Sequence, residues 1–491
     1  MTHRPPSAAP AFRFRAEAML LALAWFAQPL AAQAMDPLDT ASLVPPRPAL
    51  RPSDAAGGNP CSPHDLQAPL SLIEVVDLAL CRNPQTALVW ANARAQAALV
   101  GVTQGAYLPT LSAVLGESRN RTDSGILPSP YTQKSASLTL SYLLYDFGGR
   151  AATLENARQL LAAAAATQDS TVQGVFLAAL QAFYQVQANQ AALAASEESE
   201  KASRESFNAA EARYRVGTAT PADKLQAQTA LSQATLNRIQ AEGNLKIANG
   251  TLANVIGLNA QQPIQVVPAA SVAPAANFEQ DINALVATAQ QHRPDLIAAE
   301  AQFKAAQANV DTVRAAGRPT ISLTATPAYQ NAADVPMHSS SVGVSVSIPI
   351  FNGFSPTYRI RQAEAQAEAK AAQRDQVQLQ VALDVWQAYQ NLNTATQTLR
   401  TTADLLVSAE AAQKVALGRY KAGVGSILDV LNAQSALASA RQQRVQSTYS
   451  WNVSRATLAQ SMGNLDVSLL ETLPDVALPG QPGNSQGKKQ P

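Results

Sequence analysis

The chain has 491 residues, of which 47% are hydrophobic, 14% are charged and 5% are aromatic, and its formal net charge is +1. This composition excludes a disordered chain and gives no electrostatic reason to expect nucleic acid as a partner. An average soluble domain has roughly 25% charged residues. Here alanine supplies much of the apolar share, while glutamine and asparagine fill polar positions. Such a composition favours long helices in close contact.

The N-terminus has the pattern of a secretory signal peptide over residues 1–34. Arg13 and Arg15 precede an apolar run at 19–26, and an Ala-Gln-Ala sequence at 32–34 is a suitable cleavage site. The apolar run is shorter than the about 20 residues that a membrane anchor needs. No cysteine lies at the cleavage site, so no lipid anchor is expected there. The mature chain is therefore predicted to be exported.

The chain has two cysteines, Cys61 and Cys81. In an oxidising compartment an isolated pair predicts a disulfide, which would tie the Pro-rich leader (residues 35–70) to the first helix. Closing a loop of this size stabilises the fold by roughly 3 kcal/mol in the chain-entropy model. Two unrelated buried thiols are the alternative. The four histidines are widely separated, so neither a metal site nor another cofactor is expected.

The two halves of the chain repeat one another. Pro84 recurs as Pro294 at an offset of 210, and farther along Leu177 recurs as Leu383 at an offset of 206. A fixed long period indicates a duplicated structural unit, here half of a pseudo-symmetric protomer. The mature chain is divided accordingly into a first repeat (71–280), a second repeat (281–472) and a disordered C-terminal tail (473–491).

Each repeat contains a stretch without proline that is far longer than an average helix of about 11–12 residues. The two stretches lie between Pro130 and Pro221 and between Pro356 and Pro474. A helix of some 60 residues spans roughly 90 Å, so other helices must support it along its length. Long helices are predicted at 154–215 and 358–421, return helices at 222–256 and 426–462, and an equatorial connection at 257–280, halfway along the shaft.

Each repeat also contains a β-hairpin, predicted at 107–147 and 319–351. From residue 342 to 348, valine and isoleucine alternate with glycine and serine, and period-two alternation marks strands with one apolar face. Strands of about 10 residues suit a barrel that spans a bilayer. Four strands of a soluble sheet are the alternative. Candidates for an aromatic girdle at the membrane surface are Tyr145, Phe147 and Phe351.

Four strands cannot close a barrel, because about eight is the observed minimum. An open sheet edge in lipid leaves backbone groups without hydrogen bonds. The protomer must therefore oligomerise, and three copies give a twelve-stranded barrel continued by twelve helical columns. The predicted fold class is an α+β membrane protein, an internally duplicated protomer that forms a trimeric β-barrel and α-barrel.

Several short motifs occur in a fixed order, and one of them is duplicated. They are residues 72–80 with Asn83-Pro84, Tyr107-Leu108-Pro109, the six residues 145–150, Phe351-Asn352-Gly353, and the pair Arg213-Tyr214-x-x-Gly217 and Arg419-Tyr420-x-x-Gly423. In this arrangement the chain resembles the TolC family of outer-membrane factors, the exit ducts of Gram-negative efflux pumps and type I secretion systems. The resemblance implies a homotrimer in outer-membrane lipid with a long periplasmic α-barrel. Its implied partners are a periplasmic adaptor protein and an inner-membrane ABC or RND transporter.

The resemblance also implies which residues narrow the periplasmic entrance. Asp429 matches an acidic residue of the constriction, and Asn432 stands where the best-known member has a carboxylate. Asp223 and Tyr420 match positions that help to hold the gate closed. Gly425 replaces the arginine of that latch, which implies a weaker or differently bonded closed state. The tip turns contain Gly217, Gly423 and Gly425, with Tyr214 beside the first of them.

The two carboxylates have an alternative role as helix caps. Thr220 and Ser426 are hydroxyl N-caps, and Asp223 and Asp429 follow them three residues later. The residues by themselves favour capping, whereas the resemblance favours a place in the pore for Asp429. The two roles are compatible. In three chains Asp429 would form a ring of carboxylates that attracts cations.

The predicted function is a passive outer-membrane duct for type I protein secretion. The missing lipid-anchor cysteine and the tip motifs favour secretion over the alternative, an outer-membrane component of an RND efflux pump. A trimeric surface stalk without transport would have a strict heptad core, and no sustained heptad pattern is found in these helices. No nucleophile–base set, phosphate loop or metal-ligand spacing occurs in the sequence, so an enzyme is not expected.

Overall fold

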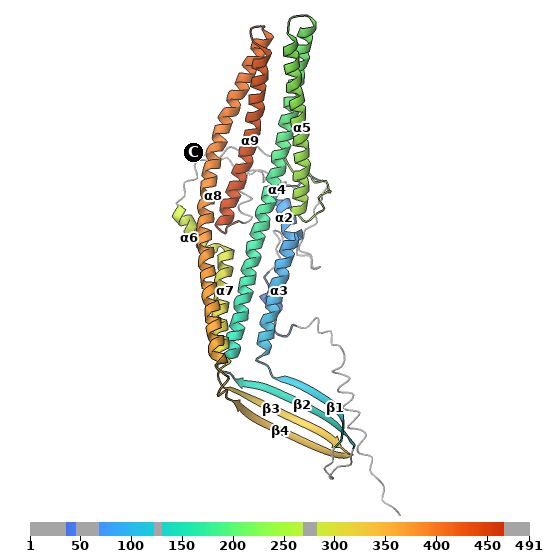
Figure 1. Cartoon of the computed structure of the whole chain (residues 1–491), viewed down its shortest axis with the longest axis vertical. Coiled ribbons are helices and arrows are strands. Elements are labelled where there is room, and N and C mark those ends of the chain that lie inside the picture. Colours follow the sequence, from blue (N-terminus) through green and yellow to red (C-terminus); the bar gives the residue numbers. More distant parts are fainter. Residues whose placement is uncertain (1–35, 46–67, 122–129, 269–281, 466–491) are drawn as a thin grey trace, which may run out of the picture.

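The computed structural model describes residues 36–45, 68–121, 130–268 and 282–465. A long shaft of helices carries a small sheet at one end (Figure 1). The predicted signal peptide, Cys61 and the predicted C-terminal tail lie outside the described residues. Among the helices of the described ranges, none combines the length and apolar character needed to cross a membrane.

The two repeats contain the same helices in the same order. After a short 3-10 helix, η1 (Thr40–Leu43), the first repeat has α2 (Leu72–Arg82), α3 (Pro84–Gly105), α4 (Gly149–Arg215) and α5 (Pro221–Val255). The second repeat has α6 (Ile282–His292), α7 (Pro294–Ala315), α8 (Ser355–Lys421) and α9 (Ile427–Ser461). Counterparts have equal lengths of 11, 22, 67 and 35 residues. The duplication in the sequence is therefore a duplication of helices.

In each repeat one long helix runs the whole length of the shaft, and two shorter helices lie end to end beside it. α4 packs along α3 near the sheet and along α5 farther away, as α8 packs along α7 and α9 (Figure 1). Because α4 also packs against α7 and α9, the columns stand side by side. α8 forms one edge of this layer, and α3 and α5 form the other.

α4 begins at Gly149, earlier than the start expected at residue 154. Gly148 precedes it with a left-handed backbone (φ 91°) and provides no side-chain cap. Asp146 takes that role, because its Oδ2 accepts a hydrogen bond from the backbone N–H of Arg150 at 2.7 Å. A carboxylate is favourable at the positive end of a helix. The turn that closes the first hairpin therefore also starts the long helix.

The four strands form one antiparallel sheet in the order β1-β2-β3-β4. They are β1 (Thr110–Asn120), β2 (Tyr131–Tyr145), β3 (Thr320–Ala332) and β4 (Val335–Ser347). β2 of the first hairpin pairs with β3 of the second, so both repeats build the same sheet. β1 and β4 are its edges, and within the described chain each has a partner on one side only.

The predicted girdle residues lie where the sheet meets the helices: Tyr145 ends β2, and Phe147 and Phe351 follow β2 and β4. Tyr145 contacts Phe147 edge-to-face with 4.8 Å between the ring centroids, and Phe351 contacts Phe354 in the same way at 5.5 Å. All four rings are exposed. Aromatic rings at this level suit the boundary between lipid and water.

The largest apolar core lies halfway along the shaft, where α2 covers α4 and α5. Val75 and Val76 of α2 pack with Phe176 and Phe183 of α4 and Leu252 of α5. In the second repeat the equivalent contact is smaller, with Leu285 and Ala289 of α6 against Val381 and Val385 of α8. Burial of this kind, rather than helix propensity, supplies most of the stability of helices in proteins.

Candidate functional site

The end of the shaft farthest from the sheet consists of two helical tips, where α4 turns into α5 and α8 turns into α9 (Figure 1). In the first tip the N–H of Thr218 donates to the carbonyl of Arg213 at 2.9 Å, and Gly217 donates to Tyr214 at 3.0 Å. The matching bonds of the second tip are Val424 to Arg419 at 3.0 Å and Gly423 to Tyr420 at 3.1 Å. These are Schellman motifs, in which the glycine takes the left-handed φ of 78° found at both tips.

Both return helices start with a complete capping box. In the second, the Oγ of Ser426 accepts from the N–H of Asp429 at 3.1 Å, and Oδ2 of Asp429 accepts from the N–H of Ser426 at 3.2 Å. Thr220 and Asp223 make the same pair of bonds in the first. Asp429 is nevertheless exposed, and its Oδ1 makes no hydrogen bond to the described residues. Capping therefore leaves part of the carboxylate facing solvent.

Two further second-tip residues lie close to this cap. Asn432 is exposed three residues after Asp429, a spacing that places both side chains on one face of α9. At Gly425 an added Cβ would lie 3.0 Å from the Cβ of Arg419 and 3.1 Å from the backbone nitrogen of Tyr420. The turn thus packs closely on the end of α8, and a side chain at position 425 would push against the Arg419 and Tyr420 atoms there.

An arginine–tyrosine contact, not foreseen from the sequence, joins the two tips. The guanidinium carbon of Arg213 lies 4.2 Å from the ring centroid of Tyr420, and its Nη2 donates to the Tyr420 carbonyl at 3.0 Å. Tyr420 is buried and packs against Ile427 and Val430. Cation–π contacts contribute about 0.5–1 kcal/mol at exposed sites and about 2 kcal/mol when desolvated. In the sequence, both residues belong to the duplicated Arg-Tyr-x-x-Gly motif, which marks the two tips but does not say which arginine meets which tyrosine.

Two polar contacts hold α4 to α9 below the tips. Nη1 of Arg441 lies 2.6 Å from Oε2 of Glu198, and Nε2 of Gln434 donates to the hydroxyl of Ser206 at 2.9 Å. The Glu198 side chain is largely exposed. Exposed ion pairs are worth about 0–1 kcal/mol. The ion pair between Arg441 and Glu198 is therefore a weak link between the two repeats.

Glu200 joins α4 to α5 within the first repeat. Its carboxylate accepts from the hydroxyl of Thr235 at 3.0 Å and from Nε of Arg238 at 2.7 Å. The hydrogen bond from Thr235, followed by those from Arg238 and Arg204, holds the pKa of Glu200 below its ordinary value. The carboxylate therefore stays charged at neutral pH and braces the first helical pair.

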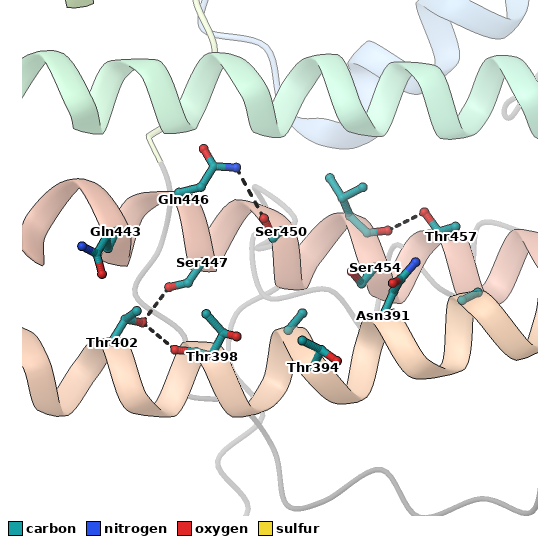
Figure 2. A pocket seen from close by; sticks show the side chains of 13 residues that line it. Asn391, Thr394, Thr398, Thr402, Gln443, Gln446, Ser447, Ser450, Ser454 and Thr457 are labelled. Carbon is teal, nitrogen blue, oxygen red and sulfur yellow. Dashed lines mark hydrogen bonds between the residues drawn. The ribbon is translucent and has the colours of Figure 1, made fainter. Parts of the chain in front are cut away.

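A groove of about 540 Å³, lined by small apolar and uncharged polar residues, runs between α8 and α9. Figure 2 shows hydroxyl and amide side chains from both helices along it, and Thr402 and Ser447 share a hydrogen bond of 2.8 Å across the interface. Val453 lines the groove, while Met462, nine residues later at the C-cap of α9, packs against the α6 cluster. Nine residues amount to about two and a half helical turns. The groove therefore faces away from α6.

Cys81 is buried at the end of α2. Because Cys61 lies outside the described residues, the bridge between them stays a prediction. Mass spectrometry of the mature protein without reductant is expected to show one intramolecular disulfide and no thiol alkylation, and reduction should make both cysteines reactive. Two cysteines that alkylate freely in native, unreduced material would contradict it.

The chain combines long paired helices with a four-stranded sheet whose edge strands, β1 and β4, each lack a partner on one side within the described chain. This is the architecture of one protomer of an oligomeric channel. Two stretches, residues 75–258 and 285–464, each match the family described as outer membrane efflux protein. The chain therefore belongs to this family, which is the TolC family predicted from the sequence motifs, and its members are outer-membrane channels rather than enzymes.

Curated relatives and solved structures agree with this assignment. The chain is 32% identical to Protein CyaE of Bordetella pertussis, covering 84% of this chain and 88% of that protein. It is 27% identical to outer membrane efflux protein BepC of Brucella suis, covering 77% and 82%. The CmeC outer membrane channel of Campylobacter jejuni has the same fold, with a TM-score of 0.73 at 18% identity, covering 80% of this chain and 86% of that one.

Proposed function

We propose that three copies of this chain form an outer-membrane duct for type I protein secretion. The four-stranded sheet with its two open edges, β1 and β4, carries the proposal. An open edge in lipid leaves N–H and C=O groups unpaired, and four strands are too few to close a barrel. Pairing β4 of each chain with β1 of the next gives a closed barrel of twelve strands, with no edge left.

The same closure brings the two edges of the helical layer together. On α8, the apolar residues Leu379, Leu383 and Trp386 are 75%, 44% and 52% exposed. On α3, Leu88 and Val102 are exposed at 61% and 70%. Exposed apolar stripes on opposite edges suit a contact between successive chains. We define the α8 residues Leu379, Leu383 and Trp386 as the α8 edge stripe.

The inner wall of the tube is the side of the helical layer that faces away from α2 and α6. α6 begins 210 residues after α2 and is its counterpart in the repeat, so both lie on the same side. On the other side lies the groove between α8 and α9, lined by hydroxyl and amide groups. None of the residues that line this groove is charged. This supports passage of an extended polypeptide whose side chains vary in charge.

The tips form the periplasmic entrance in this proposal. Asp429 and Asn432 line its narrowest part, which the exposure of both and the free Oδ1 of Asp429 support. The remaining gate residues are Asp223, Tyr214 and Tyr420, held by the tip turns at Gly217, Gly423 and Gly425. A periplasmic adaptor protein and an inner-membrane ABC transporter complete the path, because a passive duct needs an external source of energy.

Secretion is favoured over drug efflux by the duplicated tip motifs. Loss of the gene in its own cell is expected to retain a secreted polypeptide inside the cells and to leave susceptibility to hydrophobic antibiotics unchanged. A plasmid copy should restore secretion, and a copy without residues 1–34 should not. Normal secretion together with increased antibiotic susceptibility would instead establish the efflux role.

A further inference from the structure

The duplicated Arg-Tyr-x-x-Gly motif contains two arginines and two tyrosines, and the contact between Arg213 and Tyr420 involves one of each. Its arginine comes from the first repeat and its tyrosine from the second. Arg419 and Tyr214, the other two members, do not meet within the chain. Arg419 is exposed, and its guanidinium has no ion pair, hydrogen bond or ring contact with the described residues. Tyr214 is 40% exposed, with the Nζ of Lys224 5.7 Å from its ring centroid.

We propose that Arg419 of each chain stacks on Tyr214 of the partner subunit, so that arginine–tyrosine contacts run round the whole tip of the trimer. This rests on the trimer proposed above. In a tube of duplicated chains a first repeat is followed by a second repeat, and that by the first repeat of the next chain. The step from first to second repeat contains the observed contact. Arg419 and Tyr420 are the counterparts of Arg213 and Tyr214 at the offset of 206. At the step from the second repeat to the next chain, the same contact therefore joins Arg419 to Tyr214 of the partner subunit.

The local backbone supports this transfer from one step to the other. Both tips end in the same Schellman hydrogen bonds and the same glycine φ of 78°, so each motif presents its arginine and tyrosine in the same frame. The close turn at Gly425 leaves no side chain to crowd Arg419. Lys224 is held by Glu211 at 3.2 Å, where the second tip has the buried Val430. Tyr214 is 40% exposed, so part of its side chain is accessible to a cation from outside the chain.

Such a ring would act as the latch of the entrance. Each tip is joined to both neighbours, so the tips separate only when stacks between chains break. The residues are positioning residues for the gate and touch no cargo.

Thiol cross-linking tests the contact directly. The Tyr214→Cys/Arg419→Cys double variant, purified as a trimer and treated with a short bis-maleimide, should give covalent dimers and trimers on a denaturing gel. The Arg213→Cys/Tyr420→Cys variant is the matched control, because its linker joins two residues of one chain and the product stays at monomer size. The two single variants and the wild-type chain, treated alike, exclude cross-links through other thiols. Light scattering before the reaction shows that each variant is a trimer.

A contrary result would be a Tyr214→Cys/Arg419→Cys variant that is a trimer by light scattering and still runs only as a monomer on the gel, while the control pair reacts. That result would overturn the stack between chains and leave the proposed duct intact. A wild-type protein that is itself monomeric would overturn the proposed function as well. Channel currents give a second readout. Arg419→Ala and Tyr214→Ala should each raise the open fraction, roughly twofold to fivefold for each stack. The double variant should open no further than either single variant, and additive effects would contradict a shared contact.

Discussion

Replacement of Asp429 by alanine is expected to reduce the preference of the channel for cations in planar bilayers and to weaken block by a multivalent cation. Three carboxylates at a constriction concentrate cations, and the effect falls as salt shortens the screening length, which is about 10 Å at 0.1 M. The wild-type selectivity should therefore decrease with rising ionic strength, and the variant should be less sensitive to salt. Asp429→Asn should act like Asp429→Ala, because it removes the same charge.

Asp223→Ala is the matched control, since it removes the same carboxylate position from the other capping box. Loss of a capping interaction costs on the order of 1 kcal/mol, so both alanine variants should lower the thermal stability of the tips to a similar degree. Only the Asp429 variants should change selectivity, because in the proposed entrance Asp429 lines the narrowest part whereas Asp223 only helps to hold the gate closed. Equal losses of stability with unchanged selectivity in both would reduce Asp429 to a helix cap.

Placing a carboxylate in the α8 edge stripe is expected to prevent assembly. The wild-type protein in detergent should be an elongated trimer on the order of 140 Å long, because 67 helical residues span roughly 100 Å and the strands add roughly 40 Å. Trp386→Asp should be a monomer by light scattering. A buried interface tryptophan typically contributes about 2 kcal/mol or more, here at each of three seams, and a desolvated charge adds to the loss.

Gln443→Lys serves as the control for a new charge on the shaft. Gln443 is exposed on α9, which lies between α4 and α8 and cannot reach the edge of the layer. This variant should remain a trimer. Circular dichroism should show the same helix content in both variants, so that failure to assemble is distinguished from failure to fold. A Trp386→Asp protein that still forms trimers would remove α8 from the interface.

The helices, the strands and their duplication followed from local features of the chain. Prolines are missing over stretches that α4 and α8 then occupy, and the alternation near residue 342 becomes β4. Helix and strand periods act over a few residues, so a single sequence records them. The capping boxes at Asp223 and Asp429 are local in the same way, since each joins residues three apart. The Gly217 and Gly423 turns also belong to this class.

The contacts between distant segments were decided by the tertiary structure. The early start of α4 depends on a carboxylate in the preceding turn, and the pairing of β2 with β3 joins strands from different repeats. Arg213 meets Tyr420 across 207 positions of the chain. The motif named both residues, but whether an arginine reaches its own or a neighbouring tyrosine depends on how α4 and α8 pack. The sequence by itself thus determined the helices, strands and caps, because these arise from neighbouring residues. Packing decided which tips, edges and faces meet, because such contacts depend on the positions of whole helices in space.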